Sequence, residues 1–290
     1  MNHDSLKTAI FDQHEIIKNF KIVNREYQFD LNANYVLIGL RRAGKSTLLY
    51  KIVQDLVSNG IEWNQIIYIN FEDERLLEFN VNDFNDILSV QAEMSDKKGW
   101  FFFDEIQNVD GWEKFARRMA DSKEHTFITG SNAKMLSSEI EKCLGGRFLT
   151  KYIAPYNFRE FLTAKKVDFS EKSILSTKAI GKINREFETY FYFGGFPENL
   201  EYKDKREYVS SIYQKVLLGD IAARNGIRNT NGLRLLMKKI AETVKDEVSF
   251  SKFHNILKTI GVSISKDVVI DYIGYAQQSF LIFTVKNYFS

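Results

Sequence analysis

One short segment of the 290-residue chain, residues 39–47, constrains the fold more than any other part of the sequence. It reads Gly-Leu-Arg-Arg-Ala-Gly-Lys-Ser-Thr and fits the pattern G-x-x-x-x-G-K-[ST], in which backbone N–H groups of a glycine-rich turn wrap around phosphates. The apolar run 35–38 precedes it, and residues 45–58 follow with apolar side chains at helical spacing. A strand, a turn and a helix in this order are the context that the phosphate loop needs, because the amino end of the helix then faces the anion.

The pattern assigns a role to each polar position of this loop. Lys45 is predicted to reach the β- and γ-phosphates, and the hydroxyl of Ser46 is predicted to bind Mg²⁺. Arg41 and Arg42 either contact phosphate through their guanidinium groups or take exposed roles in salt bridges. The residues predicted to bind nucleotide are Gly39, Arg41, Arg42, Ala43, Gly44, Lys45, Ser46 and Thr47.

A second, acidic motif follows the apolar run 100–103, where Asp104 and Glu105 stand next to each other. An aspartate at a strand end beside the loop can hold Mg²⁺. The carboxylate one residue later points to the other side and can orient and deprotonate a water molecule. By itself the acidic pair could be a solvated strand end, but beside a phosphate loop it favours ATP hydrolysis. The chain has no Asn-Lys-x-Asp motif, which disfavours GTP.

Short apolar strands alternate with helices in the first half of the chain. This alternation predicts an α/β fold with a parallel sheet that carries helices on both faces. Ligands of such sheets bind beyond the carboxyl ends of the strands, where both motifs would lie. The predicted strands are 35–38, 66–71, 100–103, 126–129 and 149–153, and the predicted helices between them are 45–58, 84–94 and 113–120.

After Pro155 the sequence becomes mainly helical, and we expect three domains in all. These are a P-loop ATPase core at 1–160, a helical lid at 161–230 and a winged-helix-like region at 231–290. In the last region, residues 249–258 and 265–278 read as two helices joined by a turn, and 280–283 read as a strand.

The charges of the second of these two helices indicate whether the chain binds DNA. It carries Lys266 against Asp267 and Asp271, whereas sequence-independent DNA binding rests on clustered basic residues. DNA is therefore left open as a partner but is not favoured.

Several segments resemble prokaryotic AAA+-type P-loop ATPases related to the archaeal ATPase and STAND groups. The resemblance covers nearly the whole chain and implies ATP and Mg²⁺ as ligands of a molecular switch or motor that hydrolyses ATP to ADP. An ATP-controlled DNA-binding regulator is the alternative. The segments are Asp104-Glu105-Ile106-Gln107, Thr129-Gly130-Ser131-Asn132, Gly146-Arg147, Phe158-x-Glu160-Phe161-Leu162, Gly194-Gly195-Phe196-Pro197-Glu198 and Gly219-Asp220-Ile221.

The resemblance also implies roles that spacing does not give. Asn132, with Ser131 or Thr129 as alternatives, would sense the γ-phosphate at the tip of the fourth strand. Arg147 would neutralise charge on the transferred phosphoryl group, either in its own site or in that of a neighbouring subunit. The predicted catalytic residues are Glu105, Lys45, Asn132 and Arg147, and the predicted metal ligands are Ser46 and Asp104.

Glu72 and Asp73 resemble the acidic pair that lies beside the active site in this group of ATPases. A plain cap at the end of the strand 66–71 is the alternative, and we prefer it.

Composition limits the compartment and the partners. The net charge of +2 gives no bulk electrostatic reason to bind nucleic acid or membranes, so we expect a protein partner or self-association. Cys143 is the only cysteine, and the sequence has neither a signal-peptide pattern nor an apolar stretch of membrane-spanning length, so a cytoplasmic location is expected. Proteins of the resembled group usually continue past the point that corresponds to Ser290. The chain is therefore either a short member or part of a longer protein.

Overall fold

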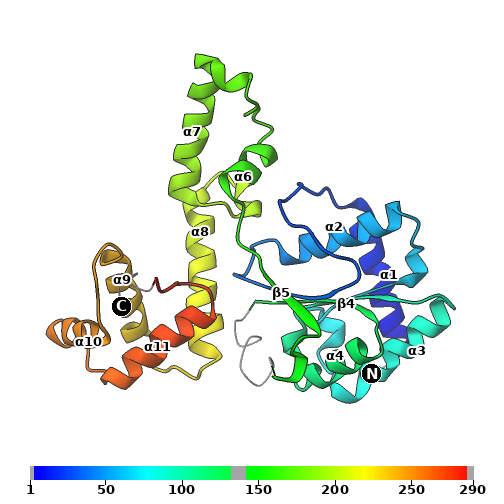
Figure 1. Cartoon of the computed structure of the whole chain (residues 1–290). Coiled ribbons are helices and arrows are strands. Elements are labelled where there is room, and N and C mark those ends of the chain that lie inside the picture. The colour runs from blue at the N-terminus through cyan, green and yellow to red at the C-terminus, as the bar shows by residue number, and fades with distance from the viewer. Residues whose placement is uncertain (1–2, 132–141, 286–290) are drawn as a thin grey trace. The chain divides into compact units, whose positions relative to one another are not determined.

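The computed structural model describes residues 3–131 and 142–285, and the chain divides into two compact units, residues 1–201 and 202–290 (Figure 1). The predicted domain boundaries near 160 and 230 each fall inside one of these units, and they stay predictions.

A five-stranded parallel sheet forms the centre of the first unit. The strand order is β2-β3-β4-β1-β5, so β1 lies between β4 and β5. All five strands predicted from the sequence are confirmed, as is the α/β fold class, with a parallel sheet followed by a helical region. The strands are β1 (Asn34–Ile38), β2 (Ile66–Asn70), β3 (Trp100–Asp104), β4 (His125–Gly130) and β5 (Phe148–Tyr152).

One face of the sheet is covered by α2 (Lys45–Ser58), which follows the phosphate loop (Figure 1). The rings of Tyr68, Phe102 and Phe127, from three neighbouring strands, stack with centroid distances of 6.2 and 5.2 Å. Buried aliphatic side chains of α2, among them Leu49, pack in the same cluster. Since all three rings are fully buried, this stack fixes α2, and with it the loop, against the sheet.

The opposite face is covered by α3 (Phe84–Met94) and α4 (Trp112–Asp121) (Figure 1). Successive side chains of a strand point to opposite faces, so Phe103 faces these helices while Phe102 faces α2. The ring of Phe115 lies 5.7 Å from that of Phe103 and stacks on Phe84 at 4.3 Å. Helices on both faces account for the continuous burial of β3 from its first residue to its last.

The described residues of the first unit also form α1 (His3–Asn19), α6 (Phe158–Ala164) and α7 (Thr177–Phe193). α1 packs against β2, α2 and α3, and an extended segment joins it to β1. After β5 the chain forms α6, α7 and a short 3-10 turn at Pro197–Leu200.

Helices are the only regular secondary structure among the described residues of the second unit. It begins with α8 (Lys205–Gln214), which continues as a π-helix over Lys215–Ala223. α9 (Thr230–Glu242), α10 (Phe250–Thr259) and α11 (Lys266–Gln278) follow. The side chains of Ser249 and Ser265 cap α10 and α11 by accepting backbone N–H bonds. Both helices lie where the sequence predicts them, at 249–258 and 265–278.

The strand predicted at 280–283 is wrong. Phe280 instead has a left-handed backbone, with φ 56°, and the N–H groups of Phe280 and Leu281 donate to carbonyls of the last turn of α11. Within residues 202–285 no other strand offers a ladder, so this apolar run has no partner with which to pair. The winged-helix assignment stays a prediction.

None of the helices in residues 3–131 and 142–285 combines the length and apolar character that a membrane crossing requires.

The aromatic stack on the α2 face generates a prediction about stability. Phe102→Ala should lower the free energy of unfolding by about 3–5 kcal/mol, because it leaves a cavity between two buried rings. Leu77→Ala, at a side chain that is 83% exposed, is the control and should change stability by less than about 0.5 kcal/mol. Urea unfolding measures both, and a Phe102→Ala loss as small as that of the control would contradict the packing.

Candidate functional site

The phosphate loop leaves the carboxyl end of β1 and enters α2 through a left-handed backbone. Arg42 has φ 61° and Gly44 has φ 94°. Left-handed residues of this kind turn neighbouring N–H groups into one concavity that suits an anion, and the amino end of α2 adds its dipole. Gly39 has no room for a side chain, because a Cβ there would lie 2.1 Å from the carbonyl oxygen of Ile153.

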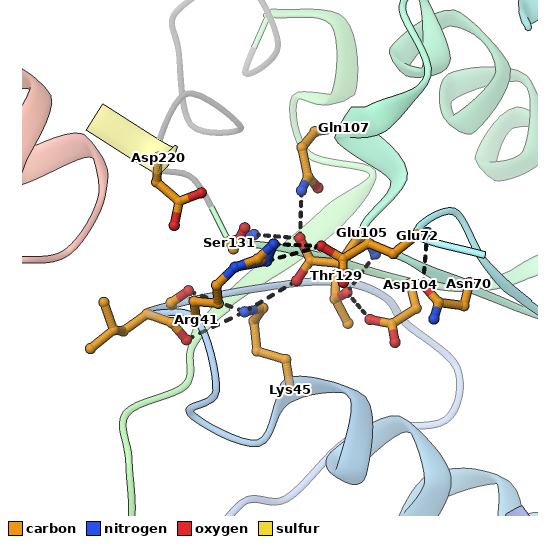
Figure 2. Close-up of polar contacts among 12 residues, drawn as sticks. Arg41, Lys45, Asn70, Glu72, Asp104, Glu105, Gln107, Thr129, Ser131 and Asp220 are labelled. Atoms are coloured by element: carbon orange, nitrogen blue, oxygen red, sulfur yellow. Dashed lines mark hydrogen bonds and ion pairs between the residues drawn. The ribbon is translucent and has the colours of Figure 1, made fainter. Parts of the chain in front are cut away.

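Lys45 is the first residue of α2 and is buried, with an exposed fraction of 4%. Its ammonium donates to the carbonyl oxygens of Gly39 and Leu40 at 3.2 and 3.4 Å, and it lies 3.4 Å from a carboxylate oxygen of Glu105 (Figure 2). All three distances are long for a charged hydrogen bond. A phosphate oxygen in the loop would therefore offer this ammonium a stronger acceptor than any that it now has.

Asp104 is buried at the carboxyl end of β3 and accepts bonds from two hydroxyls. Thr129 donates to one carboxylate oxygen and Tyr68 donates to the other at 2.9 Å, and the nearby hydroxyl of Ser46 also favours the ionised form. Burial raises the pKa of Asp104, and the neighbouring Glu105 carboxylate raises it further, while the three hydroxyls oppose the shift. A nearby cation would therefore stabilise the ionised form of Asp104.

The oxygen atoms of Asp104 and Ser46 suit Mg²⁺, which prefers hard oxygen ligands. Within the described part of the chain, no three carboxylate, histidine or cysteine side chains gather into a metal site. Mg²⁺ usually keeps several waters and binds through one or two protein ligands and substrate phosphates. Phosphate oxygens and water would therefore complete the ligand set to which Ser46 and Asp104 contribute.

Glu105 follows Asp104 but points elsewhere, because its backbone is left-handed with φ 52°. The side-chain amide of Gln107 and the N–H of Ser131 donate to its carboxylate (Figure 2). Burial opposes ionisation of this group, but the Lys45 ammonium and these donors outweigh burial, so the pKa of Glu105 is lowered. Glu105 is therefore an ionised, buried carboxylate beside the loop, as a proton acceptor must be.

Thr129 contacts both members of the acidic pair, the carboxylate of Asp104 and the backbone of Glu105. Its hydroxyl donates to Asp104 and accepts the backbone N–H of Glu105 at 2.9 Å. Asn132, which is the first choice for a sensor, lies outside the described residues. Of the two alternatives, Thr129 reaches the acidic pair through its side chain and Ser131 through its backbone. Their role as sensors stays a prediction.

Both loop arginines form salt bridges. Arg41 donates two bonds, of 2.7 and 2.9 Å, to one carboxylate oxygen of Glu72. Arg42 pairs with Glu198 of the turn after α7. Asp73 accepts the backbone N–H of Arg75 and caps a short 3-10 turn, as the preferred alternative predicted, whereas Glu72 holds the loop arginine.

Arg147 lies far from the loop of its own chain. It precedes β5, and its neighbour Phe148 pairs with Asn34 at the amino end of β1. The phosphate loop follows the opposite, carboxyl end of the same strand. The guanidinium of Arg147 instead donates to Asp121 at the end of α4. The structure thus brings Lys45, Ser46, Asp104 and Glu105 together but leaves Arg147 out.

Sequence reasoning missed one residue at this site, Arg25. It lies in the segment between α1 and β1, and its guanidinium donates to the carbonyl oxygen of Ala43 inside the loop at 2.9 Å. It also donates to the carboxylate of Glu160, 135 residues away. Glu160 stood out as part of a family-like motif, but no sequence pattern pairs it with Arg25.

The family models divide the chain. Residues 32–162 match the model of an AAA domain. Residues 184–290 match the model of a domain of unknown function. The closer relation to the archaeal ATPase and STAND groups stays a prediction.

Two relatives match most of the chain. An uncharacterized protein of Methanocaldococcus jannaschii is 36% identical over 289 residues, and one of Haemophilus influenzae is 34% identical over 257 residues. These alignments cover 97% and 87% of this chain. The chain spans 63% and 62% of the length of these two relatives. Among solved structures, that of Cdc6p from Pyrobaculum aerophilum aligns with 99% of this chain and 92% of its own, with 13% identity and a TM-score of 0.34. Likeness at that level supports no conclusion about this chain.

The raised pKa of Asp104 predicts a stability that depends on pH. A carboxyl whose pKa is raised by folding stabilises the fold while it is protonated, and this contribution is lost as pH rises through the raised pKa. Without Mg²⁺ and nucleotide, Asp104→Asn should therefore melt higher than wild type at about pH 8, by about 2–4 °C, and the difference should shrink towards about pH 4. Asp110→Asn, at an exposed position, is the control. A lower melting temperature for Asp104→Asn at about pH 8 would contradict the account.

Proposed function

We propose that the chain binds Mg²⁺ and ATP at the loop 39–47 and hydrolyses ATP, acting as a molecular switch or motor. One observation carries the proposal. The adjacent carboxylates of Asp104 and Glu105 point to different partners, the first to the hydroxyl of Ser46 and the second to the ammonium of Lys45. ATP hydrolysis needs this division, since one carboxylate must serve the metal and the other must serve the attacking water.

In this mechanism the loop amides and Lys45 hold the phosphates, and Ser46 and Asp104 hold Mg²⁺. The metal, when bound, neutralises charge on the phosphate oxygens. Glu105 accepts a proton from the water that attacks the γ-phosphate, and its lowered pKa keeps it ionised at neutral pH. Because Lys45 lies only 3.4 Å from Glu105, binding of a triphosphate also draws the ammonium towards phosphate and releases the base.

Arg147 acts, in this proposal, on the nucleotide of a neighbouring subunit. Its place at the amino end of β5 is too remote for a role at the loop of its own chain. An arginine supplied from a neighbour stabilises the charge that develops on the transferred phosphoryl group. The partner is thus a second copy of this chain. DNA binding is not proposed, since α11 carries Lys266 against two acidic residues.

Two substitutions separate binding from hydrolysis. Glu105→Gln should keep the Kd for ATP near the wild-type value and lower kcat about 100- to 10,000-fold, because it removes the proton acceptor. Lys45→Ala should raise the Kd for ATP about 10- to 100-fold, because it removes a charged donor to phosphate. Calorimetric titration gives Kd, and phosphate release gives kcat.

The matched control is Glu78→Gln, an exposed carboxylate on the same domain, and it should change neither quantity. Wild-type turnover by Glu105→Gln would show that this residue is not the base.

Mixing two inactive variants tests the role of Arg147 in a neighbouring site. Arg147→Ala alone and Glu105→Gln alone should both hydrolyse ATP poorly. In a head-to-tail assembly, a subunit with intact Glu105 then meets a neighbour with intact Arg147 at about one quarter of the interfaces of an equal mixture. Phosphate release by the mixture should recover to about that fraction. Sedimentation with a non-hydrolysable ATP analogue should show assembly. No recovery, in a mixture that assembles, would contradict action between subunits.

A further inference from the structure

Arg25 contacts three separate parts of the first unit, although its side chain is only 3% exposed. It donates two bonds to the carboxylate of Glu160, at 3.2 and 3.0 Å. A third bond, of 2.7 Å, goes to the carbonyl oxygen of Ala154 just after β5. A fourth, of 2.9 Å, goes to the carbonyl oxygen of Ala43 in the phosphate loop.

The surroundings hold this guanidinium in one place. The rings of Tyr27 and Tyr156 lie 5.0 and 5.1 Å from it, at the distance of a cation–π contact. Glu160 is equally buried and also accepts the backbone N–H groups of Glu26 and Asn157, at 3.0 and 3.1 Å. Each carboxylate oxygen of Glu160 therefore accepts two hydrogen bonds. If either side chain turned away, the charge of the other would stay buried without its partner.

Stability alone is a weak explanation for such a pair. A buried ion pair costs much of its attraction in lost hydration, and well-packed apolar side chains often replace it without loss. The contact that apolar side chains cannot replace is the bond to Ala43, which lies in the loop itself. The next residue, Gly44, also lies beside Arg25, because a Cβ on it would lie 3.3 Å from the guanidinium.

The geometry of a peptide bond gives this contact a consequence for phosphate binding. In a trans peptide the carbonyl oxygen and the following N–H lie in one plane and point in opposite directions. With its carbonyl bonded to Arg25, the peptide between Ala43 and Gly44 has its N–H directed away from Arg25. A loop that binds phosphate through its backbone needs this N–H to hold one direction before the anion arrives.

We propose that Arg25, held in place by Glu160, is a positioning residue of the phosphate loop that fixes the Gly44 amide for phosphate. The proposal rests on the proposed function of the loop and extends it. The same carboxylate forms the capping box of α6 with Asn157, so the loop, the end of β5 and the start of α6 are joined through one ion pair. Phosphate binding is thereby linked to the helix with which the predicted lid begins.

The test uses the full chain and two variants. In Arg25→Met with Glu160→Gln, no buried charge is left unpaired and the bond to Ala43 is lost. Arg25→Lys keeps the charge but cannot bond Glu160 twice and reach Ala43 as well. Tyr27→Phe is the control, because it removes a hydroxyl from the same corner, one that accepts the N–H of Ala154 at 3.2 Å, and leaves the bond to Ala43. Thermal unfolding confirms that each variant is folded at the temperature of measurement.

The readout is the Kd for ATP, for ADP and for inorganic tripolyphosphate, measured by calorimetric titration. The double variant should bind all three about tenfold more weakly, which is the size of one hydrogen bond to a charged group. Arg25→Lys should restore part of the loss, and Tyr27→Phe should match wild type. A purely structural role would lower the melting temperature and leave these constants unchanged.

Wild-type affinity for tripolyphosphate in a folded double variant would overturn the proposal. If the double variant does not fold, Arg25→Lys decides instead, and unchanged affinity there would also overturn it. Failure of the wild-type chain itself to bind ATP or tripolyphosphate would contradict the proposed function of the loop, and this measurement comes before any variant is compared.

Discussion

The hydroxyl of Thr129 makes the contact on which the rest of the site depends. It donates to Asp104 and accepts the N–H of Glu105, so one side chain holds the carboxylate of Asp104 and the backbone of Glu105. This is feasible only because β3 and β4 are neighbours in a parallel sheet and end at the same edge. The left-handed backbone at Glu105 completes the arrangement, since it turns the second carboxylate away from the first.

Three ionisable side chains of the site, Lys45, Asp104 and Glu105, are buried. Asp104 is buried with hydroxyls as donors, and its pKa is raised, whereas Glu105 is buried beside an ammonium, and its pKa is lowered. Lys45, Arg41 and Arg42 each lie against a carboxylate, namely Glu105, Glu72 and Glu198. Acidic side chains therefore neutralise the cationic side chains of the loop, and a triphosphate must compete with these carboxylates for the same cations. A bound triphosphate would release these carboxylates from their cations. Nucleotide binding would then shift any equilibrium between conformations that differ in these ion pairs.

How far the sequence predicts this structure varies by element. The five strands could be predicted because each is a short apolar run next to a turn or helix signal, and the loop because its pattern is nearly unique. The prediction of a strand at 280–283 was wrong because an apolar run indicates burial but does not provide a neighbouring strand to pair with. Arg25 could not be found, since its role depends on a contact with Glu160 across 135 residues. The place of Arg147 could not be predicted either, because it depends on the register of β1 and β5, which puts this residue at the amino end of the sheet, and its role stays a prediction.

A crystal structure with a non-hydrolysable ATP analogue and Mg²⁺ tests the central claim most directly. The account predicts that the phosphates lie in the loop, that Mg²⁺ lies beside the Ser46 hydroxyl and Asp104, and that the Lys45 ammonium has moved from Glu105 to a phosphate oxygen. Glu105 should then face a water molecule in line with the γ-phosphate. Phosphates bound outside the loop, or Glu105 still paired with Lys45 beside a bound triphosphate, would contradict it.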